Sequence, residues 1–308
     1  VELTPLQPEN EADRLAYTLL TVDMDRAART ATFTVQPPVC DHPADVAANE
    51  AARADWYPLV LARELDDAIL SMRTNELDLG TWILRTRGDT TAVQALDATL
   101  LECRNHWFVR ETVGYLRRSL ARLDVSSRSL FALIDEGSCF AGTLLELALA
   151  CDRSYQLALP DDADAAPTIQ LTEANFGLFP MVTGESRRER RFYADQVVLE
   201  ELHARIGQSL DADAAFDLGL VTGNPDDLDW DDEIRIAIEE RTAMSPDALT
   251  GMEANLRFNG RENMLTRIFG RLTAWQNWIF QRPNAVGEGG ALKVYGSGEK
   301  SRFDWDRV

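Results

Sequence analysis

The chain has 308 residues with 51 acidic against 31 basic side chains, which gives a formal net charge of −20 and a pI near 4.5. Such an acidic protein is poorly suited to bind nucleic-acid phosphates or anionic lipid, because both attract basic surfaces, and no segment is apolar over the length of a membrane span. With 45% hydrophobic residues, the chain is expected to bury a large core.

The first half of the chain alternates between strand and helix patterns. Residues 1–16 show neither pattern, and we interpret them as a lead-in from a longer polypeptide. Period-two alternation then predicts a β-hairpin over 17–36, helical spacing predicts helices over 61–74 and 98–122, and apolar runs predict strands at 81–86 and 129–135. A hairpin followed by alternating helices and strands indicates an α/β protein.

The second half continues the alternation and then becomes helical. We predict a helix from Gly142, short strands at 154–159 and 168–172, helical segments over 211–256 and a last helix over 262–280. The chain is accordingly divided into a lead-in (1–16), an α/β core (17–230), a C-terminal helical region (231–282) and a Gly-rich surface tail (283–308).

A turn of small residues leads into the helix that begins at Gly142. Backbone N–H groups are free at the first turn of a helix, so Gly142 and Thr143 are candidate donors to a developing oxyanion. Glu146 lies one turn later in an otherwise apolar helix, where a carboxylate needs a partner or a raised pKa, and it is a candidate general acid or base. A glutamate at the solvated edge of a core helix explains the same pattern.

A second carboxylate, Glu173, follows the predicted strand 168–172. Two glutamates on loops after neighbouring strands can flank one water or one substrate carbon, which is the arrangement for adding or removing water. The alternative is that Glu173 is an acid at a helix start, where the macrodipole favours negative charge.

The segment from Gly137 to Asp152 resembles the glutamate-bearing helix of the crotonase (enoyl-CoA hydratase/isomerase) superfamily. Glu146 falls on the family's first catalytic glutamate, and Glu173 and Pro180 match its Pro-Glu-x-x-x-Gly-x-x-Pro segment. The resemblance covers roughly 17–282. It implies a crotonase-like fold of two roughly perpendicular β-sheets wrapped by helices, and an acyl-CoA thioester as substrate, without any further cofactor.

Several segments, among them HWFVRETVGYLRRSLARL and RIFGRLTAWQNWIF, are absent from ordinary crotonases. They are similar to the C-terminal half of the family's ring-opening lyases of aerobic benzoate breakdown. This resemblance implies conversion of 2,3-epoxybenzoyl-CoA with water into 3,4-dehydroadipyl-CoA semialdehyde and formate. It also implies an N-terminal crotonase-like half on the same polypeptide, and a homodimer.

The sequence departs from the family pattern at the expected oxyanion site. The family's Gly-Gly-Gly run is Gly142-Thr143-Leu144 here, and nothing in residues 88–98, GDTTAVQALDA, reproduces the loop that supplies the second oxyanion N–H. This half is therefore also interpreted as a non-catalytic structural and dimerisation partner, with a complete thioester site in the other half. A generic enoyl-CoA hydratase is a third alternative.

Further candidates come from isolated charges. Arg187, Arg188 and Arg191 are candidate contacts for the phosphates of coenzyme A, with a solvated helix face as the alternative. Glu262 precedes an apolar helical face, and we expect it to project into a ring-binding pocket and to position the attacking water; a simple helix-start acid is the alternative.

Cysteines and histidines give no metal site. The spacing Cys103-x-x-His106 has no second ligand pair, so we predict no bound metal. Four widely separated cysteines indicate reduced thiols, and the first residues lack the pattern of a secretory leader. We therefore expect a cytoplasmic protein.

Overall fold

The computed structural model describes residues 1–39, 43, 45–260 and 262–307. Its main sheet has the strand order β1-β2-β3-β4-β5-β6-β7. The strands are β1 (Glu9–Glu11), β2 (Arg14–Ala16), β3 (Leu20–Asp25), β4 (Thr30–Val35), β5 (Thr81–Thr86), β6 (Ser129–Ile134) and β7 (Arg153–Gln156). Pairing is antiparallel from β1 to β4 and parallel from β4 to β7. A second, two-stranded sheet pairs β8 (Ile169–Gln170) with β9 (Ser209–Leu210).

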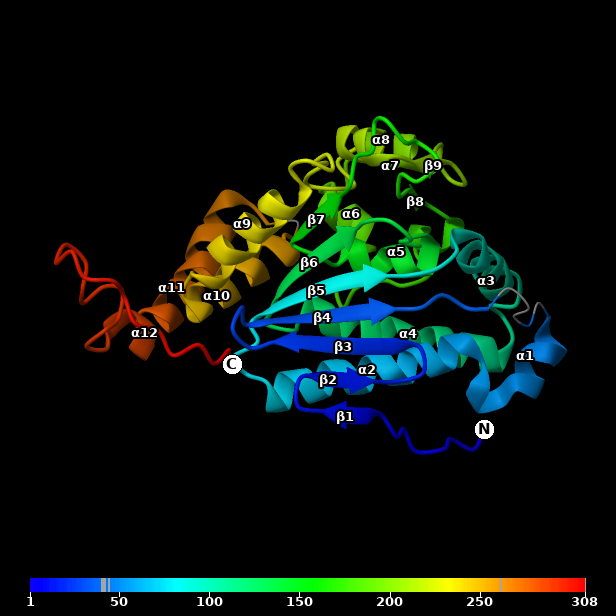
Figure 1. Cartoon of the computed structure of the whole chain (residues 1–308), viewed down its shortest axis with the longest axis horizontal. Helices are drawn as coiled ribbons and strands as arrows, with labels where there is room; N and C mark the ends of the chain where they lie inside the picture. Colours follow the sequence, from blue (N-terminus) through cyan, green and yellow to red (C-terminus); the bar gives the residue numbers. More distant parts are fainter. Residues whose placement is uncertain (40–42, 44, 261, 308) are drawn as a thin grey trace.

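Helices fill most of the connections between the strands from β4 onward and continue beyond β9 (Figure 1). The elements before β7 are α1 (Val46–Ala52), η1 (Arg53–Asp55), α2 (Tyr57–Asn75), α3 (Thr90–Glu102), α4 (Trp107–Asp124) and α5 (Gly142–Leu149). Those after β8 are η2 (Glu173–Phe176), α6 (Arg187–Arg191), α7 (Gln196–His203), α8 (Ala212–Asp217), α9 (Trp230–Thr242), α10 (Pro246–Arg257), η3 (Thr266–Leu272), α11 (Thr273–Ile279) and α12 (Pro283–Val286).

The burial of each strand follows from its place in the sheet. All six residues of β6 are buried, as a continuous apolar run predicts for a central parallel strand. In β4, Phe33 and Val35 are buried while Thr32 and Thr34 between them are partly exposed, so this strand turns one face to the core. α2 and α4 pack against each other beside the sheet, and Figure 1 shows them running along one of its faces.

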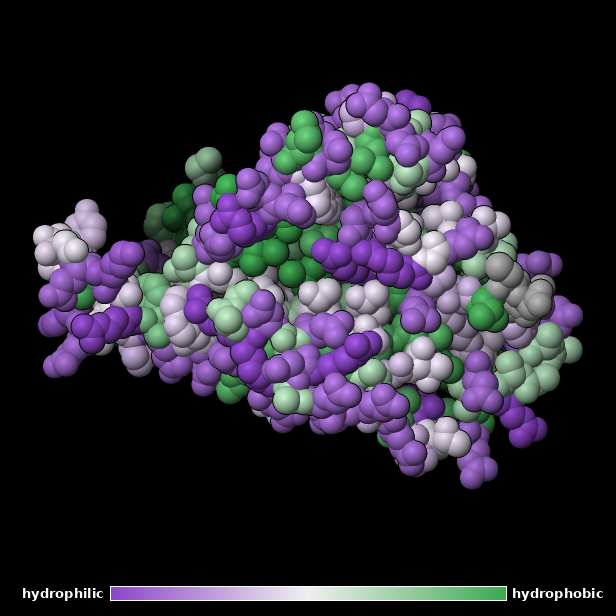
Figure 2. Space-filling model, viewed as in Figure 1, coloured by the Kyte–Doolittle hydropathy of each residue, from purple (hydrophilic) through white to green (hydrophobic). Residues whose placement is uncertain are grey.

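The outer surface is largely covered by polar and charged side chains, as expected for a chain rich in charged residues. The face in Figure 2 is mainly hydrophilic, and apolar residues gather in a hollow near its middle. Within the described residues, no helix combines the length and the apolar character needed to cross a bilayer.

Several predicted elements change in the structure. The predicted helix 98–122 is two helices, α3 and α4, which are separated by a break at 103–106. The lead-in 1–16 contains β1 and β2, whose three-residue length gives too little alternation to be recognised. The predicted last helix begins at Met264, two residues later than expected, and then passes through the π-helical turns of η3.

The predicted surface tail is also not entirely on the surface. Arg307 is 3% exposed, and its guanidinium lies 2.7 Å from the buried carboxylate of Glu253. The end of the described chain is therefore attached to α10 and to the edge of the core.

Candidate functional site

Glu146 lies in the second turn of α5, and its carboxylate is fully engaged by two neighbours. Arg187 Nη1 is 3.0 Å from Oε2, and Asn175 Nδ2 donates to Oε1 at 2.8 Å. The side chains of Glu146 and Arg187 are each 2% exposed. Burial raises the pKa of Glu146, while Arg187 and Asn175 oppose the rise.

Arg187 also binds a second carboxylate, that of Asp124 at the end of α4. Its Nε and Nη2 donate to the two Asp124 oxygens at 3.0 and 2.8 Å, and Nη1 donates to the carbonyl oxygen of Phe179 at 3.2 Å. One guanidinium therefore neutralises two buried carboxylates, and burial raises the pKa of Asp124 as well. With its donors turned to Asp124, Glu146 and Phe179, Arg187 has no free edge for a coenzyme A phosphate.

The first turn of α5 is occupied by a carboxylate that sequence reasoning missed. Asp97, from α3, accepts a hydrogen bond from Thr143 N at 3.0 Å and from Thr172 Oγ1 at 2.6 Å, and Thr143 Oγ1 donates to its other oxygen. Asp97 is 1% exposed, and burial raises its pKa to about 6. The signal for it was helical spacing, because Asp97 stands one turn from Val93 and Leu100 on the apolar face of α3.

Glu173 lies at the first position of η2 and remains accessible. Its side chain is 56% exposed, and Oε1 lies 3.7 Å from His203 Nε2. A cavity of about 460 Å³ is lined by Leu101, Arg104, Glu173, Phe176, Gly177 and Leu178. Among the three candidate glutamates, Glu173 is therefore the one that both lines a cavity and is open to solvent.

Glu262 lies before η3, beside two arginines of that element. Its Oε2 is 2.6 Å from Arg271 and 3.9 Å from Arg267. Leu265 and Phe269, on the apolar helical face that follows Glu262, are 66% and 70% exposed. The immediate partners of this carboxylate are thus the cationic side chains of two arginines.

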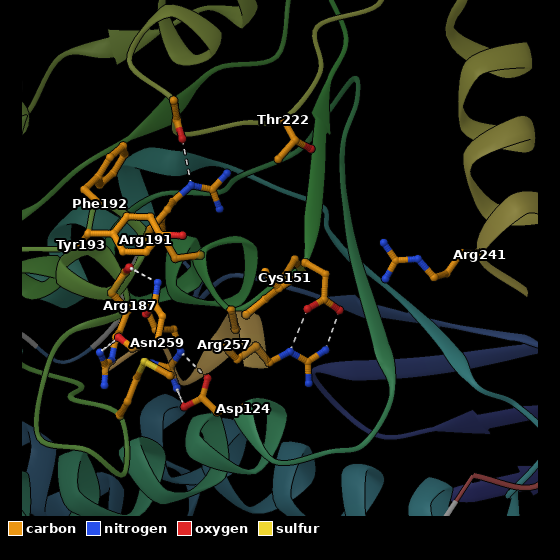
Figure 3. Close-up of a pocket in the computed structure, with 17 residues that line it drawn as sticks. Asp124, Cys151, Arg187, Arg191, Phe192, Tyr193, Thr222, Arg241, Arg257 and Asn259 are labelled. Carbon is orange, nitrogen blue, oxygen red and sulfur yellow. Dashed lines mark hydrogen bonds and ion pairs between the residues drawn. The ribbon is translucent and has the colours of Figure 1, made fainter. Parts of the chain in front are cut away.

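Of the other two candidate arginines, Arg191 lines a cavity of about 400 Å³ at the C-terminal end of α5 (Figure 3). Arg191 donates through Nε to the carbonyl oxygen of Gly219 at 2.8 Å, and its remaining nitrogens are directed toward the cavity. Arg188 lies over the Phe176 ring, 4.0 Å from its centroid. Burial lowers the pKa of both arginines.

Figure 3 also shows how much of this cavity's charge is already paired. Arg187 and Asp124 point toward each other at one end, and Arg257 binds Asp152 with Nε 2.8 Å from Oδ1. Arg241 approaches from α9 and pairs with Glu253 at 3.0 Å.

Comparison with solved structures identifies the architecture. An enoyl-CoA hydratase from Bacillus anthracis superposes with a TM-score of 0.65 at 17% sequence identity, covering 94% of this chain and all of that one. An enoyl-CoA hydratase/isomerase from Cupriavidus metallidurans gives 0.64 at 16% identity, covering 93% and 96%. The chain has the crotonase fold. This confirms the fold class that the segment from Gly137 to Asp152 predicted.

Sequence comparison gives a nearer relative of this crotonase-fold chain. This chain is 57% identical over all 308 residues to a benzoyl-CoA-dihydrodiol lyase from Aromatoleum evansii. The chain spans about half of that relative, 55% of its length. No protein-family model matches the chain. The predicted resemblance to lyases of this kind is confirmed by this relative.

Proposed function

We propose that this chain is the C-terminal half of a ring-opening lyase that converts 2,3-epoxybenzoyl-CoA with water into 3,4-dehydroadipyl-CoA semialdehyde and formate. The observation that carries the proposal is the 57% identity, along the whole chain, to a benzoyl-CoA-dihydrodiol lyase. The coverage of 55% of that relative fits a protein made of two halves. The carbon count also fits, because the seven carbons of the aromatic acyl group become six in the product and one in formate.

The proposed chemistry adds water to a strained ring and then cleaves a carbon–carbon bond. Both steps need proton transfer by side chains, and coenzyme A enters only as part of the substrate. Among the three candidate glutamates, Glu173 has the access that a general acid or base needs. Arg191 lines the cavity at the end of α5 and is the candidate contact for a coenzyme A phosphate.

A second function is favoured by a specific contact. Because Glu146 is buried against Arg187 and Asn175, its carboxylate stabilises the fold and has no face open to a substrate. This half then supports the enzyme structurally, and the other half of the polypeptide binds the thioester. In that case Glu146 is a structural residue, and neither Glu173 nor Glu262 transfers a proton.

The same proposal includes a cytoplasmic location and assembly as a homodimer. Cys103, Cys139 and Cys151 are buried free thiols, as expected for a cytoplasmic protein. The proposed homodimer would cover apolar side chains of the C-terminal helices; Leu265 and Phe269 are 66% and 70% exposed.

The proposal is tested with the full-length protein that contains this chain. Purified enzyme is incubated with 2,3-epoxybenzoyl-CoA, and formate and the semialdehyde thioester are quantified together. One formate per substrate consumed supports the ring-opening lyase. Hydration of crotonyl-CoA without any formate from the epoxide would instead show a generic enoyl-CoA hydratase.

A further inference from the structure

The N-terminus of α5 has no capping side chain of its own. Its N-cap residue is Ala141, which offers no side-chain acceptor, so the free N–H groups of the first turn need an anion or acceptor from elsewhere. Helix N-termini attract anions through these groups and the macrodipole. In a crotonase-like site the same turn would face the oxygen of a thioester.

The acceptor in this chain is the carboxylate of Asp97. Its Oδ2 receives Thr143 N and Thr172 Oγ1, and its Oδ1 receives the Thr143 hydroxyl. Asp97 and Thr143 are 1% and 2% exposed, so water has no access to this contact. All three donors are therefore used within the protein.

Gly142 is what allows the carboxylate to come so close. A Cβ at this position would lie 1.6 Å from Asp97 Oδ2, which is far inside any tolerated contact. Its φ of +39° is also a conformation that residues with a side chain rarely adopt. The glycine that would admit a substrate oxygen here admits the oxygen of Asp97.

The position of Asp97 in the sequence also supports its role as a replacement for a substrate oxygen. It belongs to residues 88–98, the segment that lacks the family-like loop expected to supply a second oxyanion N–H. The loop that would supply the second oxyanion N–H is thus missing from the sequence of this segment. The same segment instead carries the carboxylate of Asp97, which accepts hydrogen bonds. A carboxylate beside a developing oxyanion raises its energy, because two negative charges a few ångströms apart repel strongly in a buried site.

We propose that Asp97 is a built-in occupant of the anion-binding N-terminus of α5, where it takes the place of a thioester oxygen and excludes the thioester group of an acyl-CoA from this helix terminus. The thioester identity of the excluded group rests on the proposed function, whereas the occupancy by a carboxylate does not. The thioester of the full-length enzyme is then held by the other half of the polypeptide.

The occupancy is tested by replacing the internal carboxylate with an external one. The Asp97→Ala variant of the 308-residue chain is unfolded thermally at pH 7.5 in sodium formate and in equal concentrations of sodium chloride. Formate binding to the emptied site should raise its midpoint by roughly 3 °C or more over chloride, in a saturable manner. The unsubstituted chain should show no such difference, because Asp97 already fills the site.

A matched control is Asp211→Ala. Asp211 also accepts a helix N–H, from Ala214 at 2.9 Å at the start of α8, but the contact is exposed and water replaces the lost carboxylate. We expect no formate-specific effect there. Equal responses of Asp97→Ala and Asp211→Ala would overturn the proposal. If Asp97→Ala folds only when formate is present, the proposal is supported.

A second measurement needs no variant. The thioester 4-(dimethylamino)cinnamoyl-CoA absorbs at longer wavelength when hydrogen-bond donors polarise its carbonyl, so it reports an available oxyanion site. The unsubstituted 308-residue chain should leave its spectrum unchanged, and a red shift with this chain would overturn the proposal. Absence of formate production by the full-length enzyme would contradict the proposed function but leave this result intact.

Discussion

Arg187 and Glu146 form an ion pair inside the protein, with Nη1 and Oε2 3.0 Å apart and each side chain 2% exposed. The pair links α6 to α5, and Asp124 extends it to α4. Because one guanidinium serves two acids, the network is sensitive to loss of its cation and less sensitive to neutralisation of one acid.

Replacement of Arg187 by Met should therefore be severely destabilising. It would leave Asp124 and Glu146 buried without a cation, and loss of one partner from a buried pair costs about 3–5 kcal/mol. Urea unfolding followed by tryptophan fluorescence measures the change. The matched control is Arg110→Met, whose side chain is 63% exposed and which should change the unfolding free energy by less than about 0.5 kcal/mol. Similar effects of the two substitutions would contradict the structural role of Arg187.

Asp97 should give the stability of the chain a distinct pH dependence. Burial, with a contribution from Glu146, raises its pKa from 3.8 to about 6 in the folded protein. The folded state thus holds the proton more tightly than the unfolded state, so the contribution of Asp97 is fully present below pH 3.8 and is lost as the pH rises through 6.

The comparison that isolates this effect is the unsubstituted chain against Asp97→Asn, with the unfolding free energy measured from pH 4 to 7. The unsubstituted chain should lose stability relative to the variant, by at most about 3 kcal/mol at about 1.4 kcal/mol per pKa unit. A difference that is flat, or that changes in the opposite direction, would show that Asp97 does not titrate in this range.

Arg307 should contribute to stability although it lies at the end of the described chain. Its guanidinium pairs with Glu253 at 2.7 Å and donates to the Gly80 carbonyl at 2.9 Å. Arg307→Met should cost about 2–3 kcal/mol, since Glu253 keeps Arg241 as a second cation but loses one donor in a buried site. The control is Arg302→Met, because Arg302 is exposed. Chemical unfolding of both variants measures the change in the free energy of unfolding, which should be larger for Arg307→Met.

The sequence predicted the central strands and helices because each carries its own signal. The apolar run of β6 after Ser129 and the alternation in β4 are local patterns that burial selects. The pairing of β1 with β2 has no such signal, because each strand is three residues long and the sheet edge that accepts them is supplied by β3.

The candidate site was predictable in position but not in chemistry. Glu146 was recognised as an acid that needs a partner, yet the partner, Arg187, lies 41 residues further along the chain and was interpreted as a phosphate contact. Asp97 lay on an apolar helix face, which predicts burial, but only the packing of α3 against α5 shows that it binds Thr143. Long-range pairing of buried charges has no local signature in a single sequence.

The most direct test of the account is the turnover of the full-length enzyme with Glu146→Gln, measured as formate released from 2,3-epoxybenzoyl-CoA. Glutamine keeps the size of the side chain and an oxygen that can accept from Arg187, so the fold should persist. If the α5 site of this half is structural, turnover should stay within about threefold of the unsubstituted enzyme. A fall of about a hundredfold or more, the cost of losing a general acid or base, would contradict the account.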